Sequence, residues 1–218
     1  MADTPATARP RQYGRSAVTR ETILNAAERL FVEQGISSTS KRQLTEAAGQ
    51  SNNAAVDYHF GSWRNLVLAV LERHVVDVEQ RRERMLADLP AQPGVRELVR
   101  CMVQAYTDHL AALPQPSWYA RLNLQVLVDP QWRDVARPLL AESPTMRAAS
   151  ELAMREVAAL PEVVIRERIA MGSLLVLHMC ADREEALQHG LPTLRESWQD
   201  TGRSLVDAIT QLWLGPAN

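Results

Sequence analysis

Apolar residues recur three and four positions apart along most of the chain, and this spacing predicts helices. One apolar stripe runs from Thr19 to Gln34 and ends at Gly35, a residue suited to a helix C-terminus. Another, from Trp63 to about Leu89, predicts a long helix. No alternating pattern typical of strands and no internal repeat is found. The expected fold class is therefore all-α.

Prolines and polar residues divide the second half of the chain into further expected helices. In order, these are Val95 to Ala112, Trp118 to Val128 with Ser117 as its cap, a helix from Pro130 that Pro138 kinks or interrupts, Pro144 to Leu160, Pro161 to about Leu187, and about Leu194 to Leu214.

Two short helices joined by a tight turn are predicted between Thr39 and Phe60. Thr39 and Ser40 are suited to cap the first helix, and Gly49 is suited to end it in the left-handed conformation. Asn52 or Asn53 is expected to cap the second helix, with small residues facing inward and larger ones outward: Ala54, Ala55 and Val56, then Asp57, Tyr58 and His59. This layout is typical of a helix-turn-helix that places its second helix in the DNA major groove.

From roughly Thr19 to Leu71 the chain resembles the N-terminal domain of TetR-type transcriptional regulators. The residues that carry the resemblance are Ile23, Ala26, Ala27, Leu30, Phe31, Gly35, Tyr58, His59, Phe60, Gly61, Ser62 and Leu66. The turn after Gly49 is one residue longer than in most of the family, as in a branch with the pattern GQ-x-NN-x-A-x-x-YHFG. Asp57 stands where many members carry a phosphate-binding Tyr, and Trp63 where many carry a Lys.

Three parts of the chain are expected. Residues 1–17 contain three arginines and no apolar period, so they are interpreted as a disordered basic arm. That arm either has no role or touches DNA, as homeodomain arms do. Residues 18–62 form the helix-turn-helix domain. Residues 63–218 form a helical effector-binding and dimerisation domain, and its first helix, about 63–89, links the two.

Polar residues around the predicted turn are candidates for DNA contacts. Hydroxyls, cations and a helix N-terminus suit phosphates, whereas Asn and Gln pair with adenine. Asp57 would be repelled by phosphate, but it could accept a hydrogen bond from cytosine or orient Arg42. The candidates are Thr39, Ser40, Lys41, Arg42, Gln50, Ser51, Asn52, Asn53, Asp57, Tyr58 and Arg64.

The last two predicted helices have apolar sides that contain small residues. One side holds Ile165, Ile169, Gly172, Ser173, Val176 and Cys180, and the other Leu194, Trp198, Thr201, Leu205, Ile209 and Leu212. A monomer core would explain these residues as well as a dimer would. The resemblance favours a homodimer through these two helices, because TetR-type regulators usually pair them in a four-helix bundle. Two-fold symmetry also matches half-site DNA binding.

The resemblance further implies a small-molecule pocket among the C-terminal helices. Polar and aromatic residues on otherwise apolar helices are the usual lining of such pockets, although most residues of this kind belong to an ordinary core. The candidates are Tyr106, His109, Trp118, Arg121, Asn123, Gln125, Trp132 and His178.

Composition adds limits to this interpretation. The formal net charge of the 218 residues is -2, so any DNA affinity must arise from local clusters. Cys101 and Cys180 are expected as buried free thiols. No catalytic or metal-binding motif, signal peptide or membrane-length apolar run is present. We therefore expect no enzyme activity, metal, cofactor or membrane attachment, and a cytoplasmic location.

The sequence thus predicts a regulator that binds double-stranded operator DNA and responds to a small-molecule effector, most simply a repressor. The resemblance also implies a mechanism, in which an effector tilts the recognition helices through the long helix from Trp63, so that they no longer fit successive grooves. The alternative is a helical small-molecule-binding protein or enzyme whose helix-turn-helix has no DNA role.

Overall fold

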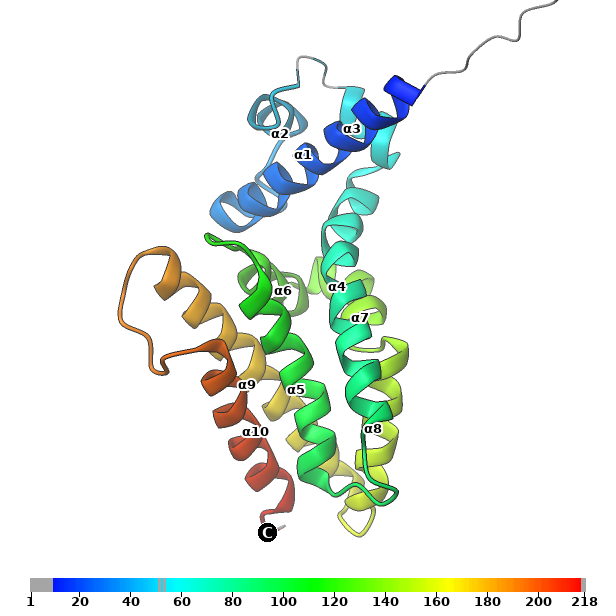
Figure 1. Ribbon diagram of the computed structural model, residues 1–218, viewed down its shortest axis with the longest axis vertical. Coiled ribbons are helices and arrows are strands. Elements are labelled where there is room, and N and C mark those ends of the chain that lie inside the picture. Colours follow the sequence, from blue (N-terminus) through cyan, green and yellow to red (C-terminus); the bar gives the residue numbers. More distant parts are fainter. Residues whose placement is uncertain (1–9, 51, 53, 217–218) are drawn as a thin grey trace, which may run out of the picture. The chain divides into compact units, whose positions relative to one another are not determined.

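The computed structural model describes residues 10–50, 52 and 54–216, and these form ten α-helices without any strand (Figure 1). In chain order they are α1 (Pro10–Gln34), α2 (Lys41–Ala47), α3 (Ala54–Phe60), α4 (Trp63–Ala87), α5 (Val95–Ala112), α6 (Tyr119–Val128), α7 (Pro130–Leu140), α8 (Pro144–Glu156), α9 (Glu162–Gln188) and α10 (Trp198–Leu214). The expected all-α fold is confirmed. Of the described helices, none is both long and apolar enough to cross a membrane.

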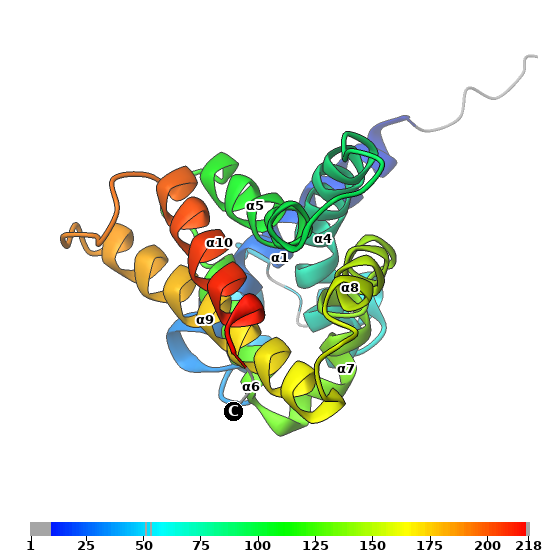
Figure 2. The same ribbon diagram turned by 90° about the horizontal axis from the view of Figure 1, so that it is seen from below.

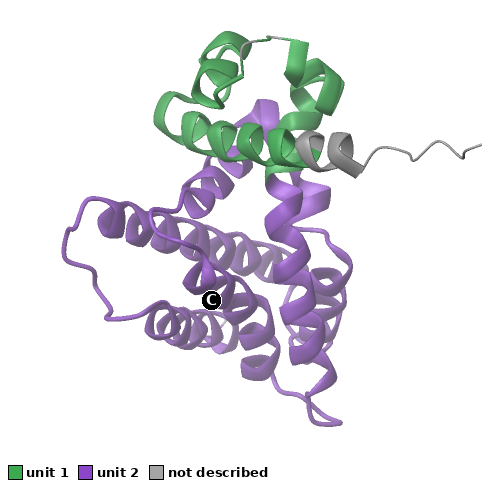
Figure 3. Cartoon of the chain, turned by 45° about the horizontal axis from the view of Figure 1, so that its top comes forward, with its two compact units in different colours: residues 1–70 green, residues 71–218 purple. Residues whose placement is uncertain are grey.

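The chain divides into two compact units, residues 1–70 and residues 71–218 (Figure 3). The division falls within α4, whereas the sequence placed the domain border before Trp63. Because α4 continues through the border, no proline or glycine marks the border in the sequence. The residues that do signal a boundary, Gly61 and Ser62, lie at the start of α4.

The first unit packs its helices around fully buried apolar side chains. Ile23 and Phe31 of α1, Leu44 of α2 and Val56 of α3 have no exposed surface. The Phe31 ring also meets Trp63, with ring centroids 5.5 Å apart. The α1 helix begins at Pro10, whereas the sequence placed the start of this helix near Thr19. Residues 1–9 of the expected basic arm lie outside the described residues.

In the second unit α5 packs against α8 and α10, while α6 packs against α7 and α9 (Figures 1 and 2). The expected bounds of α5 are confirmed at Val95 and Ala112. Pro138 lies inside α7 without ending it, because the helix continues to Leu140. The α6 helix begins at Tyr119, and Trp118 rather than Ser117 occupies the N-cap position.

Several small and apolar residues of the last two helices, including residues expected at a dimer surface, pack within the chain. Gly202 lies so close to Thr107 of α5 that an added Cβ would meet its Oγ1 at 2.5 Å. A Cβ at Gly172 would be 3.5 Å from Ile209. The other residues of the two predicted faces that are buried within the chain are Ile165, Cys180, Trp198, Thr201 and Leu205. For these residues the monomer-core alternative is correct.

Candidate functional site

The start of α2 is held by two neighbouring hydroxyl residues with different roles. Ser40 is the N-cap, and its side chain accepts a hydrogen bond from the Gln43 backbone N–H, while Gln43 Oε1 accepts one from the Ser40 N–H at 2.9 Å. Thr39 is buried, and its hydroxyl donates to the Gly35 carbonyl at 2.8 Å. Thr39, which the sequence proposed as a DNA contact, therefore uses its hydroxyl for a hydrogen bond within the chain.

The turn between α2 and α3 follows the predicted chemistry at its described positions. Gly49 has a positive φ of 65°, which suits glycine. Gln50 Nε2 donates to the Ala48 carbonyl at 3.2 Å. Asn52 Oδ1 accepts from the Ala54 backbone N–H at 2.9 Å and so caps α3. The candidates Ser51 and Asn53 lie outside the described residues.

The α3 helix is anchored by one face and exposed on the other. Val56 and Phe60 are buried, whereas Asp57 is exposed and Tyr58 leaves 80% of its surface exposed. Ala54 was expected to face inward but is exposed. A large aromatic residue with this exposure contributes little to the core, so its surface is available for contact with another molecule.

The cations of α2 are paired with nearby carboxylates. Lys41 Nζ donates to both carboxylate oxygens of Asp57, at 2.6 and 2.8 Å, and so joins α2 to α3. Arg42 Nε donates to Glu46 Oε1 at 2.8 Å. Asp57 therefore holds Lys41 and does not orient Arg42, one of the two roles considered from the sequence. Arg64, at the start of α4, is exposed and has no ion pair with any described residue.

In the second unit, two of the α5 candidates belong to buried networks or contacts. His109 Nδ1 lies 2.7 Å from Asp77 Oδ2, and its Nε2 lies 2.9 Å from His74 Nδ1. The His74 ring stacks on Tyr119, with centroids 4.0 Å apart. Tyr106 also contacts the Tyr119 ring, edge to face.

The protonation of the two histidines follows from their partners. Burial, reinforced by the charge of Arg73, lowers the pKa of His74 to about 3. Burial also lowers the pKa of His109, although Asp77 opposes this shift. In the neutral pair, His109 Nδ1–H donates to Asp77, and His109 Nε2 accepts from His74 Nδ1–H. His74 Nε2 then accepts from Arg73 Nε at 3.3 Å.

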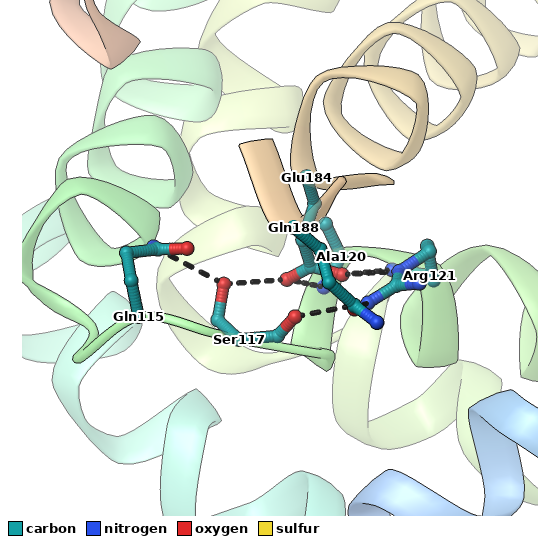
Figure 4. Close-up of polar contacts among 6 residues, drawn as sticks. All are labelled: Gln115, Ser117, Ala120, Arg121, Glu184 and Gln188. Atoms are coloured by element: carbon teal, nitrogen blue, oxygen red, sulfur yellow. Dashed lines mark hydrogen bonds and ion pairs between the residues drawn. The ribbon is translucent and has the colours of Figure 1, made fainter. Parts of the chain in front are cut away.

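A buried carboxylate of α9 holds the start of α6 (Figure 4). Glu184 has no exposed surface. Its Oε1 accepts from Ser117 Oγ and from the Ala120 backbone N–H, each at 3.0 Å. Its Oε2 accepts from the backbone N–H and the Nε of Arg121, at 3.0 and 3.2 Å. Arg121 also donates to Gln188. The carboxylate therefore does the capping that the sequence assigned to Ser117.

Most of the remaining effector candidates have a buried polar side-chain atom without a hydrogen-bond partner among the described residues. These atoms are Tyr106 Oη, Trp118 Nε1, Asn123 Oδ1, Gln125 Oε1 and Trp132 Nε1. His178 differs, because it is exposed on α9. A surface hollow without room for a water molecule is lined by Val157, Leu160, Ile165, Arg168 and Trp213, and none of the candidates lines it.

Sequence reasoning missed His74, Asp77 and Glu184 as members of these networks. A signal was present, because His74 interrupts the apolar stripe of α4, and Glu184 lies four residues after Cys180 on a buried face. Across the described ranges, no group of three or more His, Cys, Asp or Glu is placed to hold a metal ion.

Residues 23–70 match a family described as bacterial regulatory proteins, tetR family. The transcriptional repressor NicS of Pseudomonas putida is 32% identical over 92 residues, which are 42% of this chain and 43% of that protein. The transcriptional repressor AcnR of Corynebacterium glutamicum is 32% identical over 85 residues, 39% of this chain and 40% of that protein. The chain thus spans less than half the length of these relatives.

Solved structures resemble the chain over nearly its whole length. AmtR of Mycobacterium smegmatis has a TM-score of 0.62 at 20% identity, covering 98% of this chain and 92% of that one. A tetR family transcription regulator from Shewanella sp. PV-4, described as putative, has a TM-score of 0.59 at 18% identity, covering 88% and 95%. At these identities the likeness concerns the fold.

Proposed function

We propose that this chain, whose residues 23–70 match the tetR family, is a dimeric repressor that binds operator DNA and is released by a small molecule. The observation that carries the proposal is the division of α3 into a buried face, with Val56 and Phe60, and an exposed face, with Asp57 and Tyr58. A short helix held by one face can present its other face to the major groove.

The proposed DNA surface consists of α2, the turn, α3 and the start of α4. Lys41, Arg42 and Arg64 supply cations for phosphates, and the Tyr58 hydroxyl supplies a further phosphate donor. Amides at the turn supply base readout, since Asn and Gln match adenine. Of the eleven residues proposed from the sequence, Thr39 is left out because it is buried.

We infer that the dimer forms through the outer faces of α9 and α10. Ile169, Met171, Leu174 and Leu175 of α9 and Leu214 of α10 are exposed apolar residues. Exposed apolar residues that gather on two neighbouring helices are candidates for an interaction site. A closed two-fold pair would give the protein two recognition helices for two half-sites.

The effector region is proposed at α5 and α6, where buried polar atoms lack partners. Such atoms are costly to bury, so a ligand that supplies their hydrogen bonds would be bound favourably. Gln125 Oε1 carries this proposal, together with the side chains of Tyr106 and Asn123, which interact with each other. Arg121 is paired with Glu184, and His109 with Asp77. These two residues would therefore position the region rather than contact the effector directly. His178 is left out of this region because it is exposed.

Binding to DNA from the region flanking its own gene tests the proposal, measured by fluorescence anisotropy at about 50 and 200 mM salt. We expect tight binding to a short inverted repeat that weakens as salt rises. Lys41→Ala and Tyr58→Ala should each weaken it without changing thermal stability. Arg147→Ala, an exposed arginine of α8, is the matched control. Unchanged affinity in the first two variants would refute the assigned surface.

A folded protein whose weak DNA binding does not depend on salt would favour the alternative, a helical protein that binds or converts small molecules. In that case the polar atoms of α5 and α6 would carry the function, and turnover of a bound compound would identify an enzyme.

A further inference from the structure

The proposed DNA surface carries its own counter-ions. It holds three cations, Lys41, Arg42 and Arg64, and two of them are paired with carboxylates on the same surface. Lys41 binds Asp57, and Arg42 binds Glu46. Proteins that bind DNA through phosphates gain affinity because their free cations displace counterions from the duplex. A cation that already has a carboxylate partner must first exchange that partner for a phosphate.

The two ion pairs differ in what they connect. Arg42 and Glu46 lie one turn apart within α2, and their side chains are 78% and 61% exposed, so solvent screens the pair strongly. Lys41 and Asp57 join α2 to the recognition helix α3, with both carboxylate oxygens engaged and side chains 44% and 50% exposed. The Lys41–Asp57 pair is therefore the one that places a negative charge on the exposed face of α3.

We propose that Asp57 is an internal counter-ion for Lys41 that suppresses binding to DNA of arbitrary sequence, and this rests on the function proposed above. On such DNA only phosphates attract the protein, so holding Lys41 and repelling phosphate both lower affinity. At the operator, Lys41 leaves Asp57 and binds a phosphate. Base contacts from the turn and α3 compensate for the free energy that this exchange costs. Asp57 thereby raises the ratio of specific to arbitrary binding.

The test compares the full-length wild type with Asp57→Asn, Lys41→Ala and the double variant on a short duplex of arbitrary sequence and on the inverted repeat from the region flanking the gene. Asn keeps the size of Asp and removes its charge. Glu33→Gln is the matched control, because Glu33 is exposed on α1 and has no ion pair with any described residue. Fluorescence anisotropy gives the dissociation constant at several salt concentrations between about 50 and 200 mM.

We expect Asp57→Asn to tighten binding up to about fivefold for each recognition helix, the factor that corresponds to an exposed ion pair of about 1 kcal/mol. The plot of log affinity against log salt should become steeper by about 0.9 for each Lys41 released, so by about 2 for a dimer. Glu33→Gln should stay close to wild type. In the Lys41→Ala background the gain from Asp57→Asn should largely disappear.

Three results would overturn the proposal while leaving the DNA function intact. One is an equal gain with and without Lys41, which would mean simple repulsion of phosphate. Another is a gain no larger than that of Glu33→Gln. The third is loss of operator affinity in Asp57→Asn with unchanged binding to arbitrary DNA, as expected for a base contact to cytosine. If the wild type binds no DNA even at low salt, both this inference and the proposed function fail.

Discussion

Replacing Glu184 by Gln tests the buried carboxylate that holds the start of α6. The wild-type carboxylate accepts four hydrogen bonds, two from backbone N–H groups, one from Ser117 Oγ and one from Arg121 Nε. Gln has one acceptor oxygen and an NH₂ group that cannot accept. Two of the four donors would therefore lose their partner, and the partly buried Arg121 would lose its counter-charge.

The expected loss of unfolding free energy is about 3–4 kcal/mol. Breaking a buried ion pair by removing one partner costs about 3–5 kcal/mol, and each buried donor left unsatisfied costs about 1–3 kcal/mol. Gln keeps two of the acceptor contacts, so we place the value near the lower end. For a chain of this length each kcal/mol lowers the Tm by about 2–4 °C, which gives a fall of about 6–16 °C.

Thermal unfolding followed by circular dichroism at one fixed protein concentration measures this fall, because the Tm of the proposed dimer would depend on concentration. Glu185→Gln is the control, since Glu185 is the next residue of α9 and is exposed. A Glu184→Gln variant whose Tm matches that of Glu185→Gln would refute the reasoning. It would mean that the α6 terminus does not depend on this carboxylate.

Two further predictions concern pH and packing. Burial holds the pKa of His74 at about 3, below its unfolded value near 6.5, so only the unfolded state gains a proton between these values. The contribution of His74 to the unfolding free energy is fully present above about pH 6.5 and is lost as pH falls, by about 3 kcal/mol at pH 4. The unfolding free energy of His74→Phe, measured with urea, should therefore depend less on pH than that of the wild type. Gly202→Ala should lower the unfolding free energy by about 1–2 kcal/mol, because its Cβ would overlap Thr107, whereas Gly172→Ala, with ordinary contacts, should be neutral or stabilising by up to about 1 kcal/mol. Equal effects of the two glycine substitutions in thermal unfolding would contradict the packing argument.

The bounds of several helices could be predicted because glycine and proline residues mark their ends. Gly94 and Pro114 flank α5, and Gly49 ends the α2 region with the positive φ expected of it. Hydrogen bonds and apolar spacing within a helix involve residues that are close in sequence, so the pattern is visible without any knowledge of the fold.

Long-range partners could not be predicted in the same way. His74 and His109 are 35 positions apart, and Ser117 and Glu184 are 67 apart. Periodicity shows that a face is buried, but it does not show which other face covers it. For the same reason the residues around Gly172 and Gly202 were equally consistent with a dimer surface and with the chain's own core, and packing against Ile209 and Thr107 decides for the core.

The α9 helix has two faces with separate tasks. One face sends Glu184 to the start of α6, and the other exposes the apolar residues of the proposed dimer surface. Because thermodynamic linkage is reciprocal, any ligand that shifts α6 through Glu184 would also change the dimer dissociation constant, and dimerisation would change the ligand affinity by the same factor. The concentration of effector needed for release from DNA would then depend on the concentration of the protein itself.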